Sequence, residues 1–390
     1  MKILFLSPQP FFEVRGTPIN VKLVVTALGE LGHKVDLLTY PHGDTPTIPG
    51  VTIKRIPGSF LPKAPIGPSR IKVVFDAIML LHALHLAFWN KYDAVHAVEE
   101  SVFIAWIIKK LFGLPYVFDM DSHMSDQLRY SRFIKDGKIV RFIEKMENGA
   151  MRGAARIITV CQYLTDVASR VVPADKIEQI EDIPMQTDPP PEGVTAQKLR
   201  GDYEIPPHCP VILYTGNLEK YQGIDLLMES IPIITKEIPD ARFVIVGGDE
   251  ESVTRYKVIA RTMGIGDNAV FTGLKPPSLI SVFMDMADIL LSPRLEGTNT
   301  PLKIYTYLES GKPIVATGLP THTQVLTDDV AILAKPKKME YASGILLLLK
   351  DTALGQKIGE NGRKLVDENY NYEVFKSKVE SAYRGLLISS

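Results

Sequence analysis

Short apolar runs alternate along the chain with longer segments of helical period. A run of about four to eight apolar residues is typical of a buried strand, and apolar positions three and four apart indicate a helix. In the first half, strands are predicted at residues 3–7, 34–39, 94–97, 116–119 and 156–160. Helices are predicted at 18–31, 71–88 and 102–111. This alternation predicts a parallel sheet covered by helices.

The same alternation starts again in the second half. Strands are predicted there at 211–215, 242–246, 269–271, 289–292, 313–316 and 330–333. A stretch at 185–209 is rich in proline, which disfavours continuous helix and central strand. The sequence therefore predicts the α/β class, with two Rossmann-like doubly wound domains at 1–184 and 210–370 joined by this linker. A helix at 371–390 either packs on its own domain or returns to the first.

Composition excludes several classes of protein. The chain has 44 Lys and Arg against 45 Asp and Glu, so no global field draws in nucleic acid, and no nucleic-acid partner is expected. Two cysteines, Cys161 and Cys209, are not expected to form a disulfide framework or a four-ligand zinc site. A reducing compartment and a cytoplasmic location are expected. The apolar run at residues 3–6 is too short for a signal peptide.

The most apolar segment, residues 71–89, has two interpretations. It contains Asp76, His82 and His85, which argue against a membrane span and favour a packed amphipathic helix. The alternative is an interfacial helix that contacts the inner face of the cell membrane, because apolar residues 60–62 precede it. Basic residues also flank it: Lys63, Arg70, Lys72 and Lys91.

The loop after the strand at 289–292 carries the most informative chemistry. Ligands of doubly wound sheets bind beyond the carboxyl ends of the strands. Thr300 and Pro301 suit the N-cap and first position of a helix, which places Lys303 in the first turn. A cation is unfavourable there unless an anion is bound. Together with Arg294 it predicts a diphosphate site. The intervening loop residues are candidates for binding the same ligand: Glu296, Thr298 and Asn299.

Two more strand-to-helix loops in the second half are rich in glycine. The first holds Gly216, Asn217, Lys220 and Gln222, and its backbone amides and lysine suit an anion. The second contains Gly248 and then acidic residues, so a ribose or base contact fits it better than a phosphate.

Polar residues of the first half gather at predicted strand ends. Arg15 and Gly16 end the loop after the first strand, where an anion or a sugar hydroxyl could bind. His96 and Glu99 end a later strand. Asp119 and Asp121 end the next one, and carboxylates there can bind hydroxyl groups or act as a base. The Asp-x-Asp pair also suggests a metal motif, but two residues match often by chance.

Taken together, these motifs resemble the retaining family 4 glycosyltransferases, which have the GT-B fold. The resemblance covers nearly the whole length and rests on the segments 1–18, 31–35, 93–96, 214–225 and 301–317. It implies transfer of a sugar from a nucleotide-diphosphate sugar to a hydroxyl acceptor with retention, without a metal or other cofactor. It also implies that helix 371–390 crosses back to the first domain.

The chain departs from the family pattern at several positions. Asn217 and Gln222 stand where the family has the arginine and lysine that bind the donor diphosphate. Thr298 and Thr306 stand at its pair of glutamates, with Glu296 near the first. Asp121 stands at its acceptor-side histidine. Arg294, Lys303 and Lys220 are the cations that could compensate.

The leading hypothesis is therefore a glycosyltransferase in which Asp121, Lys303 and Arg294 are catalytic. The acceptor is a glycan, a lipid-linked sugar or a small molecule, bound by Arg15, Gly16, His96, Glu99 and Asp119. One alternative is a catalytically weakened sugar- or nucleotide-binding protein of the same fold, and another is a nucleotide-sugar epimerase. A nicotinamide dehydrogenase is disfavoured, since neither half carries G-x-G-x-x-G followed by an acidic residue.

Overall fold

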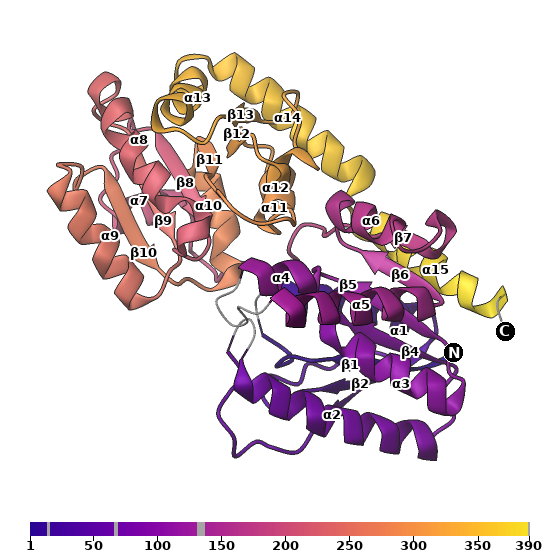
Figure 1. Ribbon diagram of the computed structural model, residues 1–390. Helices are drawn as coiled ribbons and strands as arrows, with labels where there is room; N and C mark the ends of the chain where they lie inside the picture. Colours follow the sequence, from indigo (N-terminus) through magenta and orange to yellow (C-terminus); the bar gives the residue numbers. More distant parts are fainter. Residues whose placement is uncertain (14–15, 66–68, 131–136, 389–390) are drawn as a thin grey trace. The chain divides into compact units, whose positions relative to one another are not determined.

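The computed structural model describes residues 1–13, 16–65, 69–130 and 137–388 (Figure 1). It divides into two compact units. The first comprises Met1–Asp182 together with Tyr372–Ser390, and the second comprises Ile183–Asn371. Each unit is built around its own parallel sheet.

The sheet of the first unit has the strand order β3-β2-β1-β4-β5-β6-β7, and every neighbouring pair is parallel. Its strands are β1 (Lys2–Ser7), β2 (Lys34–Thr39), β3 (Val51–Arg55), β4 (Ala94–Val98), β5 (Tyr116–Met120), β6 (Arg156–Thr159) and β7 (Ile177–Gln179). The five predicted strands are confirmed to within one residue. The two edge strands, β3 and β7, are not among the predicted strands, and both are mixed in polarity and only partly buried.

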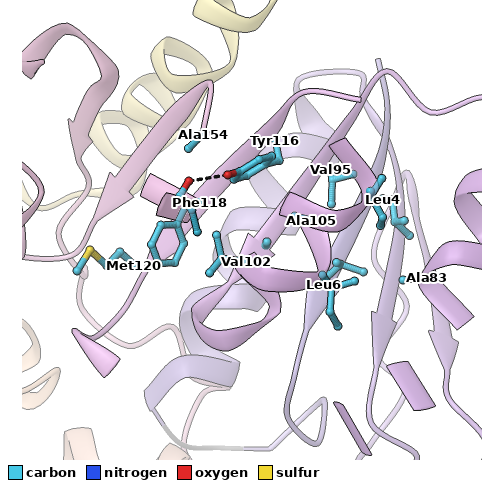
Figure 2. Packing of buried hydrophobic residues seen from close by; sticks show 14 of the residues in the cluster. Leu4, Leu6, Ala83, Val95, Val102, Ala105, Tyr116, Phe118, Met120 and Ala154 are labelled. Atoms are coloured by element: carbon cyan, nitrogen blue, oxygen red, sulfur yellow. Dashed lines mark hydrogen bonds between the residues drawn. The ribbon is translucent and has the colours of Figure 1, made fainter. Parts of the chain in front are cut away.

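Helices cover this sheet and bury its apolar strands. They are α1 (Gly16–Glu30), α2 (Arg70–Trp89), α3 (Val102–Phe112), α4 (Met124–Tyr130), α5 (Gly137–Gly153), α6 (Gln162–Ser169) and the C-terminal α15 (Tyr372–Ile388). Figure 2 shows part of the core, with Tyr116 and Phe118 of β5 near Val102 of α3. The Tyr116 hydroxyl donates to the carbonyl oxygen of Ala150 at 2.5 Å, so its polar end is satisfied inside the core.

The chain ends in the first unit, where α15 packs on α1, β6 and β7 (Figure 1). Tyr383 of this helix is buried, and its hydroxyl lies 2.7 Å from Nδ1 of His96 in β4. Nε2 of His96 lies 3.0 Å from Oδ2 of Asp119 in β5. The His96 ring also stacks on Phe5, with centroids 4.0 Å apart. The C-terminal helix is thus tied to the centre of the first sheet.

The sheet of the second unit has the order β10-β9-β8-β11-β12-β13, again wholly parallel in its strand pairs. Its strands are β8 (Val211–Thr215), β9 (Arg242–Val246), β10 (Ala269–Gly273), β11 (Ile289–Ser292), β12 (Ile314–Thr317) and β13 (Ile332–Ala334). All six strand predictions for this half are confirmed, with ends that shift by at most two residues.

The helices of the second unit begin inside the proline-rich stretch. They are α7 (Ala196–Asp202), α8 (Ile224–Glu237), α9 (Glu250–Thr262), α10 (Ile280–Met286), α11 (Lys303–Glu309), α12 (Pro320–Thr323), α13 (Lys338–Lys350) and α14 (Thr352–Asn369). The expected linker at 185–209 therefore contains a helix, α7, which the Thr195 side chain caps by accepting from Lys198 N at 3.2 Å. Leu199 and Ile205 join the core of this unit, so the stretch is part of it.

We expect Tyr383→Phe to destabilise the first unit. The ring and its packing are kept, but Nδ1 of His96 loses its hydroxyl partner in a fully buried position. An unpaired buried group costs about 1–3 kcal/mol. Urea unfolding would measure the loss, and an unchanged free energy of unfolding would contradict this role of the tyrosine.

Candidate functional site

Helix α11 is fixed on the carboxyl end of β8 through the last residue of that strand, Thr215. Nζ of Lys303 donates to the Thr215 carbonyl oxygen at 3.1 Å. The Tyr307 hydroxyl accepts from the Thr215 backbone N–H at 2.8 Å and lies 3.0 Å from its Oγ1. Lys303 and Tyr307 are four residues apart, so they project from one face of the helix. This face holds the lysine at the strand end.

The Lys303 ammonium lies in a place with little to balance its charge. It sits 4.0 Å from the centroid of the Tyr214 ring. A Cβ added at Gly216 would lie 3.6 Å from Nζ and 2.9 Å from the Tyr214 hydroxyl. Burial and then Arg294 lower the pKa of Lys303 well below its ordinary value. Within the described part of the chain, no carboxylate forms an ion pair with this ammonium.

Arg294 supplies a second cation at the end of β11. Its Nε donates to the Glu296 carbonyl oxygen at 2.7 Å, and its guanidinium lies 5.4 Å from the Tyr221 ring centroid. Gly297 has φ 122°, and a Cβ there would come within 2.1 Å of Nη2 of Arg294. Burial lowers the pKa of Arg294. Two cations in a partly buried place, one of which lowers the pKa of the other, indicate a site for an anion.

Glycines allow the neighbouring loops to touch here. A Cβ at Gly247, after β9, would lie 2.1 Å from the carbonyl oxygen of Gly216. A Cβ at Gly223 would lie 2.0 Å from the carbonyl oxygen of Pro293. Both glycines have positive φ, 118° and 73°. The loops after β8, β9 and β11 therefore approach one another more closely than residues with side chains would allow.

His322 of α12 supports the loop that holds Arg294, and this residue is not among the site residues predicted from the sequence. Nδ1 lies 2.9 Å from the Thr317 carbonyl oxygen, and Nε2 lies 2.8 Å from Oγ of Ser292. Because a carbonyl only accepts, Nδ1 carries the proton and Nε2 accepts from the serine. Burial lowers the pKa of His322 to about 3, so the ring is neutral. The Thr317 hydroxyl also donates to the Arg294 carbonyl oxygen at 2.5 Å.

The start of α11 differs from the prediction. The helix begins at Lys303, with Leu302 rather than Thr300 at the N-cap. Thr300 is buried, and its hydroxyl oxygen has no hydrogen-bond partner among the described residues. Pro301 precedes the helix and accepts from Ile304 N at 2.9 Å, so the chain makes one tight turn before the helix. The expected cap was wrong because this turn moves Thr300 away from the first free N–H groups.

The remaining loop residues of the second unit differ in how they are held. Helix α12 holds the loop after β11, since Gln324 donates to the Thr298 carbonyl oxygen and Thr321 to that of Asn299, both at 2.8 Å. Asn217, Lys220 and Glu296 are exposed. Gln222 is buried with its Oε1 lacking a partner in the described structure, and a Cβ at Gly248 would meet Leu218.

Thr306 lies apart from this group. Its hydroxyl accepts from the backbone N–H of Met185 at 3.1 Å, and the residue is buried. The side chain is therefore engaged within the unit, and its expected role in binding a donor stays a prediction.

In the first unit, Asp121 and Glu99 lie at the strand ends as predicted. Asp121 follows β5 and accepts from Nδ2 of Asn20 in α1 at 3.3 Å. Burial, followed by Asp119 and Glu99, raises the pKa of Asp121 well above its ordinary value. Glu99 follows β4 with φ 48°, an uncommon conformation outside glycine, and accepts from Oγ of Ser122 at 3.0 Å. Gly16 begins α1, and Arg15 lies outside the described residues.

The structure corrects the expected role of His96. The residue is fully buried inside β4, between Phe5 and Tyr383, so it cannot touch an acceptor. The strand runs to Val98, two residues further than His96, and only the residues after it reach the edge. Asp119 is likewise 1 % exposed within β5. One of its oxygens, Oδ1, has no hydrogen-bond partner in the described structure, while Oδ2 faces His96.

Glu147 of α5 is a second supporting residue that is not predicted from the sequence, and it holds the start of α4. It is fully buried and accepts from the backbone N–H groups of Met124 and Ser125, at 2.9 and 3.3 Å. Its Oε2 also lies 3.3 Å from Nε2 of His123. Glu147 therefore caps α4 and fixes the segment that directly follows Asp121. Its partners lie 22 and 23 residues away, so no local pattern reveals it.

Potential metal-ligating groups also meet at the other end of the second sheet. His208, Cys209 and Asp240 have ligand atoms within 4.8 Å of one another. Cys209 precedes β8 and Asp240 precedes β9, so this group lies at the amino ends of the strands. It is thus separate from the loops that hold Lys303 and Arg294.

We expect His322→Phe to destabilise the second unit. The substitution leaves the Ser292 hydroxyl and the Thr317 carbonyl without their partner in a buried place. A loss of about 1–3 kcal/mol is expected in urea unfolding. His322→Gln, which keeps a donor and an acceptor, should recover part of it. Equal losses in both variants would show that ring packing, and not hydrogen bonding, is what His322 provides.

We expect the stability of the first unit to fall as pH rises through neutrality. Burial and Glu100 raise the pKa of Glu99 from 4.5 to about 7. Between these values the unfolded chain has released the proton and the folded chain still holds it, so rising pH favours unfolding. The free energy of unfolding at about pH 5 and about pH 8 would show a smaller fall in Glu99→Gln than in wild type. The exposed control Asp175→Asn should behave as wild type, and an equal fall in all three would contradict the assignment.

Two family models match the chain, and together they cover most of it. Glycosyltransferase Family 4 matches residues 14–181, and Glycosyl transferases group 1 matches residues 195–365. The first falls on the first unit and the second on the second unit.

Relatives are distant in sequence. The chain is 23 % identical over 345 residues to an alpha-monoglucosyldiacylglycerol synthase of Streptococcus pneumoniae, which covers 84 % of this chain and 74 % of the relative. It is 27 % identical over 187 residues to YtcC of Bacillus subtilis, but this match spans only 45 % of the chain and 46 % of YtcC.

Solved structures agree with the fold over the full length. Sucrose-phosphate synthase of Thermosynechococcus elongatus matches with a TM-score of 0.81 at 19 % identity, covering 100 % of both chains. Anabaena HepE, solved with UDP, matches with a TM-score of 0.76 at 15 % identity, covering 98 % of this chain and 100 % of HepE. With two parallel-sheet α/β units and both family models matched in order, the chain belongs to the family 4 glycosyltransferases and has the GT-B fold.

Proposed function

We propose that this glycosyltransferase moves a sugar from a nucleotide-diphosphate donor to a hydroxyl group with retention of configuration. The observation that carries the donor assignment is the pair Lys303 and Arg294, two cations held at the strand ends of β8 and β11. Each is fixed by backbone carbonyl oxygens and a tyrosine ring, and neither kind of partner neutralises a charge. A diphosphate supplies the missing negative charge.

The neighbouring structures support the same donor class. HepE has been solved in complex with UDP and with UDP-glucose. In this chain the glycine loops after β8 and β9 leave backbone at Gly216 and Gly247 close together, where a phosphate or ribose could approach without meeting a side chain. The second unit is therefore the proposed donor-binding unit.

The chemical step needs stabilisation of a departing phosphate. As the bond from the anomeric carbon to the phosphate oxygen breaks, negative charge grows on that oxygen. The acceptor oxygen forms its bond to the anomeric carbon on the same face, and its proton passes to the departing phosphate. Lys303 and Arg294 are already in place, so they stabilise the charge without rearrangement. Two fixed cations perform the task that a metal ion performs in other sugar transferases, and we propose that this one is metal-independent.

The first unit is the proposed acceptor-binding unit. Asp121 and Glu99 lie at the ends of β5 and β4, where carboxylate oxygens can accept hydrogen bonds from acceptor hydroxyls. Asp119 is held by His96 behind them, so it acts as a positioning residue. One relative is named alpha-monoglucosyldiacylglycerol synthase, and a monoglucosyldiacylglycerol is a glycolipid. This name supports a glycan or glycolipid as the acceptor class.

We expect Lys303→Ala to weaken binding of nucleoside diphosphates. A cation about 4 Å from a phosphate contributes about 1–4 kcal/mol, so the Kd should rise at least about fivefold. Calorimetric titration of the full chain with a panel of nucleoside diphosphates would measure it. Lys257→Ala, on the exposed side of α9, is the matched control and should bind as wild type.

The same panel decides whether the proposal stands. If wild type binds a diphosphate and Lys303→Ala binds it equally well, the donor site has been placed wrongly. Wild type that binds a nucleotide-sugar should transfer the sugar to an added acceptor, and NMR of the product should show retention. An inverted anomeric centre, or a changed sugar formed without any acceptor, would contradict the proposed reaction.

A further inference from the structure

Helix α2 of the first unit presents an apolar face to solvent. Its exposed positions follow the helical period: Arg70, Val74, Ala77, Leu81, His85 and Phe88. Leu81 is 70 % exposed, Phe88 66 % and the adjacent Trp89 71 %. The helix is 20 residues long, and its most apolar stretch of 18 residues has a mean hydropathy of 1.8 with only 28 % of that stretch buried. A core helix of this hydropathy would be mostly buried, so this face needs a different explanation.

The opposite face of α2 is tied into the first unit, which excludes a role as a membrane span. Phe75, Met79 and Ala83 are fully buried in the core. The Asp76 carboxylate accepts from the Tyr40 hydroxyl at 2.5 Å, and Lys72 pairs with Glu100 at 2.5 Å. A helix that spanned the bilayer would have to leave these partners and expose the sheet. The apolar face therefore acts while the helix stays packed on its unit.

Aromatic side chains from α2 and α3 cluster at one end of this face. Phe88 lies with its ring centroid 5.1 Å from that of Trp89 and 6.4 Å from that of Phe112. The neighbour of Phe112 in α3, Leu111, is 62 % exposed. We call the exposed residues of α2 together with Leu111 and Phe112 the α2–α3 face. Figure 1 shows the two helices beside each other.

Most of the exposed charges around the α2–α3 face are positive, although the exposed Asp93 lies two residues from Lys91. Arg70, Lys91, Lys109 and Lys110 are exposed, and Lys110 Nζ lies 3.9 Å from the Trp106 ring centroid. Helix α3 has no acidic residue, and the one acidic residue of α2, Asp76, faces inward. Two of the lysines expected to flank the segment do not contribute, because Lys63 pairs with Glu13 and Lys72 with Glu100.

The exposed aromatic residues and lysines of the α2–α3 face together favour one kind of binding partner. Tryptophan and phenylalanine beside lysine are typical of the membrane–water interface, where the rings enter the headgroup region and the lysines meet anionic lipid. A second copy of the chain fits poorly, because a symmetric contact brings the same patch together with itself and places lysine against lysine. We propose that the α2–α3 face docks on an anionic phospholipid surface without crossing it. This surface lies outside the donor site, so the inference does not depend on the proposed reaction.

Vesicle binding by the full chain tests this inference. Wild type should co-sediment with vesicles of phosphatidylcholine and phosphatidylglycerol, and less with phosphatidylcholine alone. Lys109→Gln with Lys110→Gln should lower the partition coefficient for the anionic vesicles about tenfold or more, because each lysine near such a surface contributes about 1 kcal/mol, or about fivefold. Phe88→Ser should lower it on both kinds of vesicle. Leu274→Ser, an equally exposed apolar residue of the second unit, is the matched control and should bind as wild type.

A second measurement separates docking from damage to the fold. Trp89 is one of two tryptophans, and its emission should shift to shorter wavelength with anionic vesicles and be quenched by brominated lipid. Nucleoside diphosphate binding should be unchanged in every variant, which keeps this test distinct from that of the donor site. The inference is overturned if wild type does not bind anionic vesicles, if Trp89 shows no shift, or if alkaline carbonate fails to release the bound chain. A wild-type dimer that Phe88→Ser dissociates would assign the face to a second copy instead.

Discussion

The contact between Lys303 and the carboxyl end of β8 holds the candidate donor site together. Thr215 is the last residue of a buried strand, and two residues of α11 saturate its backbone: Lys303 at the carbonyl oxygen and Tyr307 at the N–H. If Lys303 left the Thr215 carbonyl oxygen, that oxygen would lose its hydrogen-bond partner in a buried place. Burial there already disfavours the charged form of the lysine, as its lowered pKa indicates. The helix, the strand end and the cation therefore form one rigid piece, and the glycine loops around it have a fixed wall to pack on.

Buried polar residues support this piece, others support the strand ends of the first unit, and their hydrogen-bond partners come from distant parts of the chain. His322 is neutral and buried, yet it joins the ends of β11 and β12 and, through Thr317, the backbone of Arg294. In the first unit, Glu147 holds the segment after Asp121 by hydrogen bonds. Tyr383 likewise holds His96, which in turn contacts Asp119. Both units thus position the polar groups at the ends of their strands with a second layer of buried polar groups that hydrogen bonds hold, and in the described structure only Oδ1 of Asp119 in this layer has no partner.

The strand pattern could be predicted because strands buried on both faces of a parallel sheet have little choice but to be apolar along their length. That rule fails at the edges, where β3 and β7 are only partly buried and their sequences do not predict a strand. It also fails to tell where in a strand a polar residue stands. His96 reads as a strand-end residue, but β4 continues to Val98 and buries it. Lys303 and Arg294 could be named from local spacing, whereas His322 and Glu147 could not, because their partners come from elsewhere in the chain.

The nearly balanced net charge conceals an uneven distribution. In the second unit two cations lie at the ligand end of the sheet; burial lowers the pKa of both, and Arg294 lowers that of Lys303 further. In the first unit Glu99, Asp121 and Asp182 lie near one another, and burial together with neighbouring carboxylates raises the pKa of all three. Each arrangement makes the empty unit less stable than a balanced one, because like charges are brought together out of water. The ligands proposed for the two units, an anion in the second and a molecule rich in hydroxyl groups in the first, would remove that penalty. The charges that destabilise each unit alone therefore suit the half of the proposed transfer reaction that is assigned to it.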